Sequence, residues 1–237
     1  MELDELAQRL LPFSRAHYSD RNISVSDVTK MPGHAGFSFG FTVNTSNRKD
    51  SWYIRLPPPD VKLEGTADVI RQVTALNLLP DSVPHCEVKW FGEDPCWFGR
   101  PYFIVRLLEG DTVRLSDIWI KGLTSEVRFG MAEQAIRAMI EIHNLDWSQA
   151  SYLGAPIRLE HDVNRWDRFC EKGAEKERLI LVPEVKKLLL ARLPKNIQIG
   201  IFHGDFQWSN LFYSKDGQLL AVIDWELVGI GSILNDI

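Results

Sequence analysis

The chain has 237 residues, of which 45% are hydrophobic and 25% are charged, a composition typical of a globular protein. Disorder, collagen and coiled coil are therefore excluded as descriptions of the whole chain. The formal net charge of −5 provides no basic field that would attract nucleic acid or anionic lipid, so neither is expected as a partner. At about 150 residues per domain, the length predicts one large domain or two small lobes.

The expected compartment is the cytoplasm. The N-terminal residues Met1–Phe13 are acidic and amphipathic, unlike a signal peptide, and no apolar run approaches the roughly 18 residues that span a bilayer. The 3 cysteines form no CxxC motif, which favours reduced thiols over a disulfide framework or a zinc site. We therefore expect a soluble protein without a membrane partner, and its oligomeric state stays open.

The first part of the chain is rich in strand patterns. Apolar spacing and turn residues predict a helix over Glu2–Leu11, strands over Ile23–Ser26, Phe37–Val43 and Ser51–Leu56, a helix over Thr66–Leu79 with Thr66 as a possible N-cap, and strands over Cys86–Phe91 and Tyr102–Leu107. This mixture predicts an α+β lobe over residues 1–107.

Beyond Gly110 the pattern turns helical and then returns to short strands. The predicted elements are helices over Glu126–Asn144, Asp162–Glu175 and Pro183–Leu193, followed by strands over Ile197–Phe202, Leu211–Tyr213 and Leu219–Ile223. The dipeptide Asp216-Gly217 is a strong signal for a hairpin between the last two strands. Residues 108–237 are therefore expected to form a second, mainly helical lobe.

The most informative residues follow the strand that ends near Phe202. His203-Gly-Asp205 enters a loop, Asn210 comes five positions after the aspartate, and Asp224 ends the second strand of the hairpin. Because a hairpin brings its two ends together, Asn210 and Asp224 are expected to reach one divalent ion. Mg²⁺ prefers hard oxygen ligands and retains waters and phosphate oxygens, so one carboxylate and one amide oxygen suffice. Asp205 then remains free to accept a proton from an attacking hydroxyl, or simply to orient it.

This arrangement resembles the catalytic core of protein kinases. The glycine after His203, and Ile-Asp-Trp-Glu around Asp224 in place of Asp-Phe-Gly, make the chain more similar to the aminoglycoside phosphotransferase family of small-molecule kinases, which includes choline and macrolide kinases. Ile140–Asp146 and Gly229–Asp236 also look like segments of that family. The resemblance implies a two-lobed protein-kinase-like fold, with an N-terminal antiparallel sheet that carries one helix.

The resemblance further implies that His203 supports the catalytic loop rather than transferring a proton, although it is included among the candidate catalytic residues. Glu226 is either a solvated charge or a group lying behind the metal ligands, and the sequence does not decide between them. The family usually continues for on the order of a hundred residues after the metal-binding aspartate. Because the chain stops at Ile237, a truncated or minimal C-terminal lobe is expected.

The nucleotide is expected to bind in the first lobe. Gly33 and Gly36 would let backbone N–H groups approach phosphate oxygens, and Ser38 could donate its hydroxyl. Arg55 stands where kinases have a phosphate-binding lysine, and an arginine can hold phosphate with two hydrogen bonds. Asp68 is the predicted carboxylate partner of Arg55.

The adenine should lie where the two lobes join. The backbone groups of Val105 to Leu107 are the predicted hinge, because this strand leads directly into the connection between the lobes.

The predicted activity is Mg²⁺-dependent transfer of the γ-phosphate of ATP or GTP to a hydroxyl of a small molecule. One alternative is a kinase that acts on choline, homoserine or a hydroxy acid. Another is a catalytically silent nucleotide-binding or scaffold protein, which Arg55 and the short C-terminal lobe make plausible. A protein kinase is disfavoured, since we find no counterpart of the segment between Asp-Phe-Gly and Ala-Pro-Glu.

Overall fold

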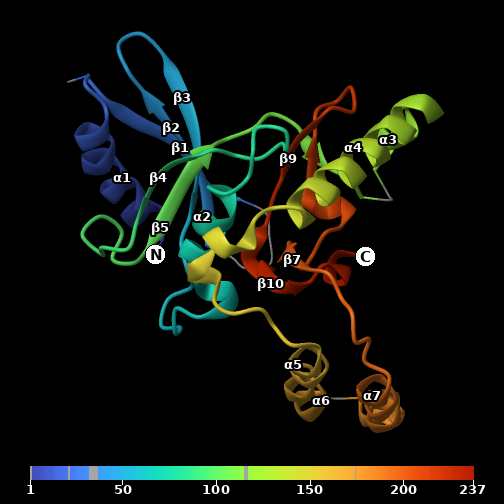
Figure 1. Ribbon diagram of the computed structural model, residues 1–237. Coiled ribbons are helices and arrows are strands. Elements are labelled where there is room, and N and C mark those ends of the chain that lie inside the picture. Colours follow the sequence, from blue (N-terminus) through green and yellow to red (C-terminus); the bar gives the residue numbers. More distant parts are fainter. Residues whose placement is uncertain (1, 21, 32–36, 115–116, 174) are drawn as a thin grey trace.

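The computed structural model describes the chain except residues 1, 21, 32–36, 115–116 and 174. A sheet-containing lobe and a mainly helical lobe lie side by side (Figure 1). The first lobe contains α1 (Leu3–His17), β1 (Ser24–Lys30), β2 (Ser38–Asn44), β3 (Lys49–Arg55), α2 (Val69–Leu76), β4 (Val88–Gly92) and β5 (Tyr102–Arg106). The second contains β6 (Asp111–Thr112), α3 (Ile118–Lys121), α4 (Ser125–His143), α5 (Leu159–Asn164), α6 (Asp167–Lys172), α7 (Val182–Ala191), β7 (Ile199–Phe202), β8 (Leu211–Tyr213), β9 (Leu219–Val222) and β10 (Gly229–Ser232).

The sheet of the first lobe has five antiparallel strands in the order β1-β2-β3-β5-β4. Side chains alternate between its two faces. On β3, Trp52 and Ile54 pack with α1 in one hydrophobic cluster, whereas Arg55 belongs to the opposite face. The sheet therefore has one face for its own core and one face for the second lobe.

Helix α1 is longer than the predicted helix, which ended at Leu11. It continues through Pro12 to His17. Proline costs a helical hydrogen bond, but Phe13 just beyond it is buried against Trp90, Trp97 and other aromatic rings. Tertiary packing of this aromatic side chain keeps the helix going past a residue that usually ends one.

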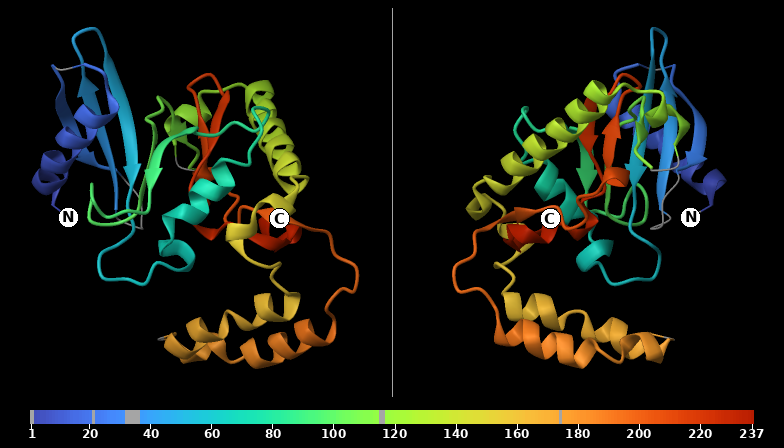
Figure 2. Two further views of the ribbon diagram at one scale, coloured as in Figure 1. Left: turned by 60° about the vertical axis from the view of Figure 1, so that its left-hand side comes forward. Right: turned by 90° about the vertical axis from the view of Figure 1, so that its right-hand side faces the viewer.

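Helix α2 lies between the sheet and the second lobe (Figure 2). Its apolar residues share one core cluster with Phe103 and Val105 of β5 and with Trp225 and Val228 of the second lobe. The N-cap is Asp68, whose carboxylate accepts a hydrogen bond from the amide of Ile70, and not Thr66. The helix is therefore shorter than predicted, and its packing belongs to both lobes.

The second lobe is built around α4 and short strands. Strands β7 and β10 pair with each other, and β8 pairs with both β6 and β9. The Asp216-Gly217 turn joins β8 and β9 as predicted, with Gly217 at a φ of 86° that favours glycine. These pairings bring the residues that follow β7 close to the residues that follow β9.

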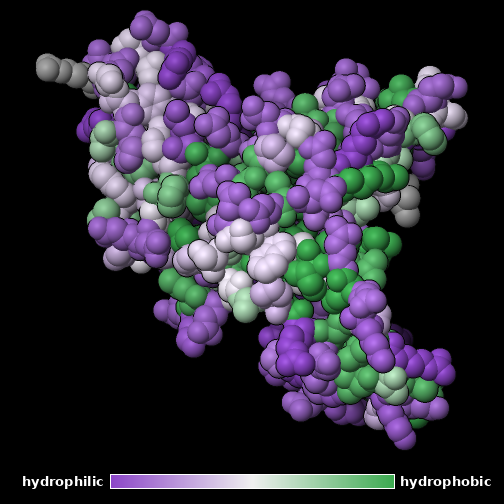
Figure 3. All heavy atoms as spheres, in the orientation of Figure 1, coloured by the Kyte–Doolittle hydropathy of each residue, from purple (hydrophilic) through white to green (hydrophobic). Residues whose placement is uncertain are grey.

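Helices α5, α6 and α7 form an arm, residues Leu159–Ala191, that projects from the rest of the molecule (Figures 1 and 2). The single helix predicted over Asp162–Glu175 is interrupted, because α5 ends at Asn164 and α6 begins at Asp167. Leu188 and Leu189 of α7 are exposed. Hydrophobic residues are visible on the surface of the arm (Figure 3). Among the residues that the structure describes, none in α5, α6 or α7 is buried, so little tertiary packing stabilises one continuous helix here.

Within the described part of the chain, none of the helices has the length and apolar character needed to cross a membrane.

Candidate active site

Strand β7 delivers the His203-Gly-Asp205 segment into the middle of the molecule. Gly204 adopts a φ of 85°, and a Cβ atom there would lie 2.5 Å from the backbone oxygen of Leu227. A side chain at this position would therefore clash with the backbone of the turn after Asp224 as well as strain the loop. The glycine allows the two loops that carry the candidate residues to touch.

The carboxylate of Asp205 is held by its neighbours in the loop. Asn210 donates through Nδ2 to Oδ2 of Asp205 at 2.8 Å, and Gln207 donates through Nε2 to Oδ1 at 2.8 Å. Asn210 is itself fixed to the hairpin, since its backbone oxygen accepts from the amide of Ile223 at 2.9 Å. Asp205 and Asn210 thus lie together, and Asn210 lies across the hairpin from the residue before Asp224.

Asp224 directly follows Ile223 and has a left-handed backbone conformation, with a φ of 64°. Such a conformation is uncommon for a residue other than glycine, and it persists only where the surroundings hold it. One carboxylate oxygen of Asp224 is 4.0 Å from Nη2 of Arg55. The second lobe therefore presents Asp224 toward the face of the sheet that carries Arg55.

Arg55 is buried, and its partner is Glu226. The guanidinium Nη2 donates to Oε2 of Glu226 at 2.8 Å. Burial raises the pKa of Glu226, and Asp224 adds to this rise while Arg55 opposes it. Burial acts to lower the pKa of Arg55, but Tyr53, Asp224 and Glu226 outweigh this effect and raise its pKa overall. A cationic Arg55 is therefore kept between two carboxylates.

The predicted pairing of Arg55 with Asp68 is not what the structure has. Oδ1 of Asp68 accepts from the amide of Ile70, and Tyr152 donates its hydroxyl to the same atom at 3.5 Å. Short aspartate side chains prefer such capping bonds to the backbone. Glu226 takes the place assigned to Asp68, so the predicted partner of Arg55 was wrong.

Ser38 lies directly opposite Arg55 in the ladder between β2 and β3. Residues opposite each other on antiparallel strands place their side chains on the same face of the sheet. Ser38 thus shares the face of Arg55, as a phosphate-binding role would require. Gly33 and Gly36, the other two residues predicted to approach phosphate, lie outside the described residues.

The predicted hinge residues are already used by the sheet. Val105 pairs with Tyr53 on one side and with Val88 on the other, and its side chain is buried. The amide of Leu107 donates to the backbone oxygen of Ser51 at 3.0 Å. An adenine ring would therefore find the Leu107 amide occupied, because β5 keeps its ladder one residue beyond its assigned end.

His203 is buried and fully hydrogen-bonded. Its Nε2 lies 2.9 Å from the backbone oxygen of Ile223, and its Nδ1 accepts from the amide of Asp205 at 3.3 Å. Burial lowers the pKa of His203. A neutral imidazole that connects the two loops fits a supporting role better than proton transfer.

Asp236 anchors the same loop from the end of the chain. Its Oδ1 accepts from the amide of Gly204 at 2.6 Å, and its Oδ2 accepts from the amide of His203 at 2.8 Å and from Nε2 of His143 at 2.9 Å. The sequence prediction gave Asp236 no role of its own. The available signal was its place in the Gly229–Asp236 segment together with the His143 motif.

The donor set fits Mg²⁺. Within the described ranges, no three or more His, Cys, Asp and Glu side chains gather in a way that could hold a metal ion. Asn210 uses its amide nitrogen toward Asp205, which leaves its carbonyl oxygen as a ligand, and the Asp224 side chain is 41% exposed. Two oxygen ligands of this kind suit an ion that retains water and phosphate oxygens.

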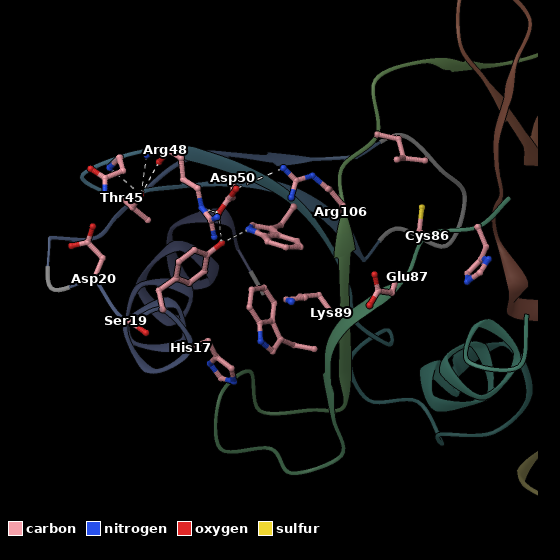
Figure 4. Close-up of a pocket in the computed structure, with 16 residues that line it drawn as sticks. His17, Ser19, Asp20, Thr45, Arg48, Asp50, Cys86, Glu87, Lys89 and Arg106 are labelled. Atoms are coloured by element: carbon pink, nitrogen blue, oxygen red, sulfur yellow. Dashed lines mark hydrogen bonds and ion pairs between the residues drawn. The ribbon is translucent and has the colours of Figure 1, made fainter. Parts of the chain in front are cut away.

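A cavity of about 860 Å³ lies elsewhere, on the α1 side of the sheet (Figure 4). Its lining includes Trp52 and Asp50, which alternate with Arg55 along β3 and so belong to the other face. Asp50 pairs there with Arg48 at 2.9 Å and accepts from the hydroxyl of Tyr18 at 3.2 Å. This cavity contributes no residue to the candidate active site.

One family model covers the whole candidate site. A family model described as "Phosphotransferase enzyme family" matches residues 31–237. The chain belongs to this phosphotransferase family. The match includes Arg55, the loop from His203 to Asn210, and Asp224.

The curated relatives that match this chain are much longer than it is. Acyl-CoA dehydrogenase family member 11 of Homo sapiens is 23% identical over 199 residues, which are 79% of this chain and 24% of the relative. A probable acyl-CoA dehydrogenase of Arabidopsis thaliana, IBR3, is 22% identical over 218 residues, or 86% of this chain and 26% of the relative. The chain thus spans about a quarter of the length of the curated relatives it matches.

Solved structures of the phosphotransferase family share the fold. A provisionally assigned aminoglycoside phosphotransferase of Ralstonia eutropha has a TM-score of 0.75 and 22% identity, with 97% of this chain and 67% of that chain covered. The GDP complex of aminoglycoside 2'-phosphotransferase-IIIa has a TM-score of 0.68 and 17% identity, covering 97% and 76%. A Plasmodium vivax ethanolamine kinase has a TM-score of 0.61 and 14% identity, with 96% of this chain and 62% of that chain covered. The two-lobed fold is therefore protein-kinase-like, as predicted.

Proposed function

We propose that this phosphotransferase-family chain is a small-molecule kinase that transfers the γ-phosphate of ATP or GTP to a hydroxyl group in the presence of Mg²⁺. The observation that carries the proposal is that Arg55 of the first lobe faces Asp224 of the second, and that the Asp205–Asn210 loop is hydrogen-bonded to Ile223, the residue before Asp224. Arg55 lies 4.0 Å from Asp224, and Asn210 lies 2.8 Å from Asp205. Phosphoryl transfer needs little more from a protein than positioning and charge stabilisation.

Each of these side chains has a part in that reaction. Asp205 accepts the proton of the acceptor hydroxyl, or orients it, while the hydroxyl oxygen attacks the γ-phosphorus. The bond from the γ-phosphorus to the β–γ bridging oxygen breaks, and ADP or GDP leaves. Arg55 uses Nη2 for Glu226 and retains other N–H donors for phosphate oxygens. Asn210 and Asp224 would hold Mg²⁺, which supplies positive charge against the phosphate oxygens.

Two of the similar structures support a nucleotide co-substrate, since they are described as complexes with GDP and with ADP. Kanamycin and hygromycin B accompany those nucleotides in the same two structures. Ethanolamine kinase shares the fold as well. The acceptor class proposed here is therefore a small molecule with a hydroxyl group, and no single compound is favoured.

The test is calorimetric titration with ATP and with GTP, with and without Mg²⁺, on the wild-type chain and on Asp224→Ala. We expect nucleotide binding that is strengthened by Mg²⁺ in the wild type and not in the variant. A panel of aminoglycosides, amino alcohols and hydroxy acids then serves to detect ADP or GDP release. Nucleotide binding with no turnover on any acceptor would favour the silent nucleotide-binding protein instead, and absence of binding would overturn the kinase proposal.

A further inference from the structure

A second arginine of the first lobe, Arg71, holds the segment that carries Asp224. Arg71 lies in α2, and its guanidinium donates through Nη1 to the backbone oxygen of Leu153 at 3.1 Å and through Nη2 to that of Val228 at 3.0 Å. Both acceptors are in the second lobe and both residues are buried. One side chain thus fastens α2 to two separate stretches of the other lobe.

The Val228 oxygen stands at the end of a tight turn that begins at Asp224. The amide of Val228 donates to the backbone oxygen of Trp225 at 3.2 Å, which closes the turn. The Trp225 side chain is buried, and its Nε1 donates to the backbone oxygen of Val222 at 3.0 Å. Displacing Val228 would therefore displace Asp224, because the residues between them form one short hydrogen-bonded unit.

The left-handed backbone of Asp224 is a reason for this support. A φ of 64° costs free energy even for an aspartate, so contacts of the surrounding residues help to hold it. Hydrogen bonds from a charged donor are about twice as strong as neutral ones, so the bond from Arg71 stabilises the position of Val228 at the end of the turn. Glu226, inside the same turn, is bound by Arg55. The first lobe thus holds the turn at two points.

We propose that Arg71 is a positioning residue that couples the first lobe to the Asp224 turn, so that Arg55 and Asp224 face the same nucleotide. The inference rests on the proposed function, since it assigns Arg71 a role in Mg²⁺-nucleotide binding. Arg71 touches neither the nucleotide nor the metal in this role. It acts through the backbone of Val228 and through the place of α2 between the lobes.

The experiment compares Arg71→Met and Arg71→Lys with the matched control Arg100→Met. Arg100 also donates to a backbone oxygen, that of Pro57 at 2.9 Å, but this bond stays within the first lobe. The first readout is hydrogen–deuterium exchange of peptides that cover residues 222–232, without nucleotide. The second is the dissociation constant of ATP and of GTP, measured in EDTA and in excess MgCl₂.

We expect Arg71→Met to increase exchange in residues 222–232 and to weaken nucleotide binding in MgCl₂ by about 10- to 100-fold, with binding in EDTA unchanged. Arg71→Lys should fall in between, because an ammonium keeps the charge without the two-pronged geometry. Arg100→Met should match the wild type in both readouts.

Equal exchange in Arg71→Met and Arg100→Met would overturn the inference whatever the nucleotide data show. Increased exchange with an unchanged effect of MgCl₂ would also overturn it, since Arg71 would then be only structural. If the wild type binds no nucleotide, the proposed function fails, and with it the role of the turn in holding a metal. If it binds and the variants bind equally well, only the inference about Arg71 fails.

Discussion

The segment from β7 to Asp236 and the arm of Leu159–Ala191 belong to the same lobe but differ in how their side chains are held. In the first, Asp205, Asn210 and Asp236 each have hydrogen-bond partners, and the strands around them are buried. In the described part of the arm, no residue of α5, α6 or α7 is buried. A site that positions reacting atoms needs side chains locked by packing and by neighbours, and only the first segment provides this.

The largest expected effect comes from Asp205→Asn, which tests whether the β7–Asp236 segment holds a reacting side chain. The asparagine keeps the size of the side chain and one acceptor oxygen, but it cannot take the proton of an attacking hydroxyl. We expect turnover to fall by about 10²- to 10⁴-fold with an active acceptor. Initial rates of ADP or GDP release measure this effect. The thermal unfolding midpoint serves as the control. It should fall less than that of Asp236→Asn, because Asp205 is only half-buried and water can replace the hydrogen bond lost to Asn210 or Gln207. Full activity in the variant would exclude Asp205 as base.

The next prediction compares the same substitution in both segments. Leu211 in β8 is 2% exposed, whereas Leu189 in α7 is 52% exposed. Leu211→Ala should lower the free energy of unfolding by about 2–5 kcal/mol, because it removes buried methyl groups and leaves a cavity. Leu189→Ala should change it by at most about 0.5 kcal/mol. Urea denaturation followed by tryptophan fluorescence distinguishes the two. A cost for Leu189→Ala as large as that for Leu211→Ala would show that the arm is covered in solution.

Asp236→Asn tests whether the loop depends on its buried anchor. One carboxylate oxygen would become an NH₂ group facing N–H donors of His203, Gly204 or His143. We expect the free energy of unfolding to fall by about 1–3 kcal/mol. The matched control is Asp81→Asn at an exposed position. Equal stability of the two variants would contradict the anchoring role.

The smallest effect is a dependence of stability on pH. Burial lowers the pKa of His203 in the folded chain, while the unfolded chain retains a histidine pKa of about 6.5. Below that pH the unfolded state binds more protons, so the contribution of His203 to stability is present above about pH 6.5 and is lost as the pH falls.

Unfolding midpoints between pH 7.5 and 5 measure this effect. His203→Gln should show a flatter dependence than the wild type, and His161→Gln, at an exposed position, should not. Parallel profiles for all three proteins would rule out His203 as the source.

Much of the candidate site could be predicted from the chain order alone. A hairpin brings the loop with Asp205 and Asn210 close to Asp224. This hairpin is a local structure that the Asp216-Gly217 turn already specifies. The partner of Arg55 could not be predicted in this way. Asp68 and Glu226 are both carboxylates, and the choice between them depends on a cap at α2 and on how the lobes meet.

The sequence by itself determined the family, the two-lobed α+β fold, and which residues lie at the ends of β7 and β9. Local hydrophobic periodicity and turn chemistry act over a few residues, so they can be read without the fold. Only the tertiary structure decided that α1 runs past Pro12, that Glu226 binds Arg55, and that Arg71 reaches Val228. Each of these depends on contacts between residues far apart in the chain, where packing outweighs local preference.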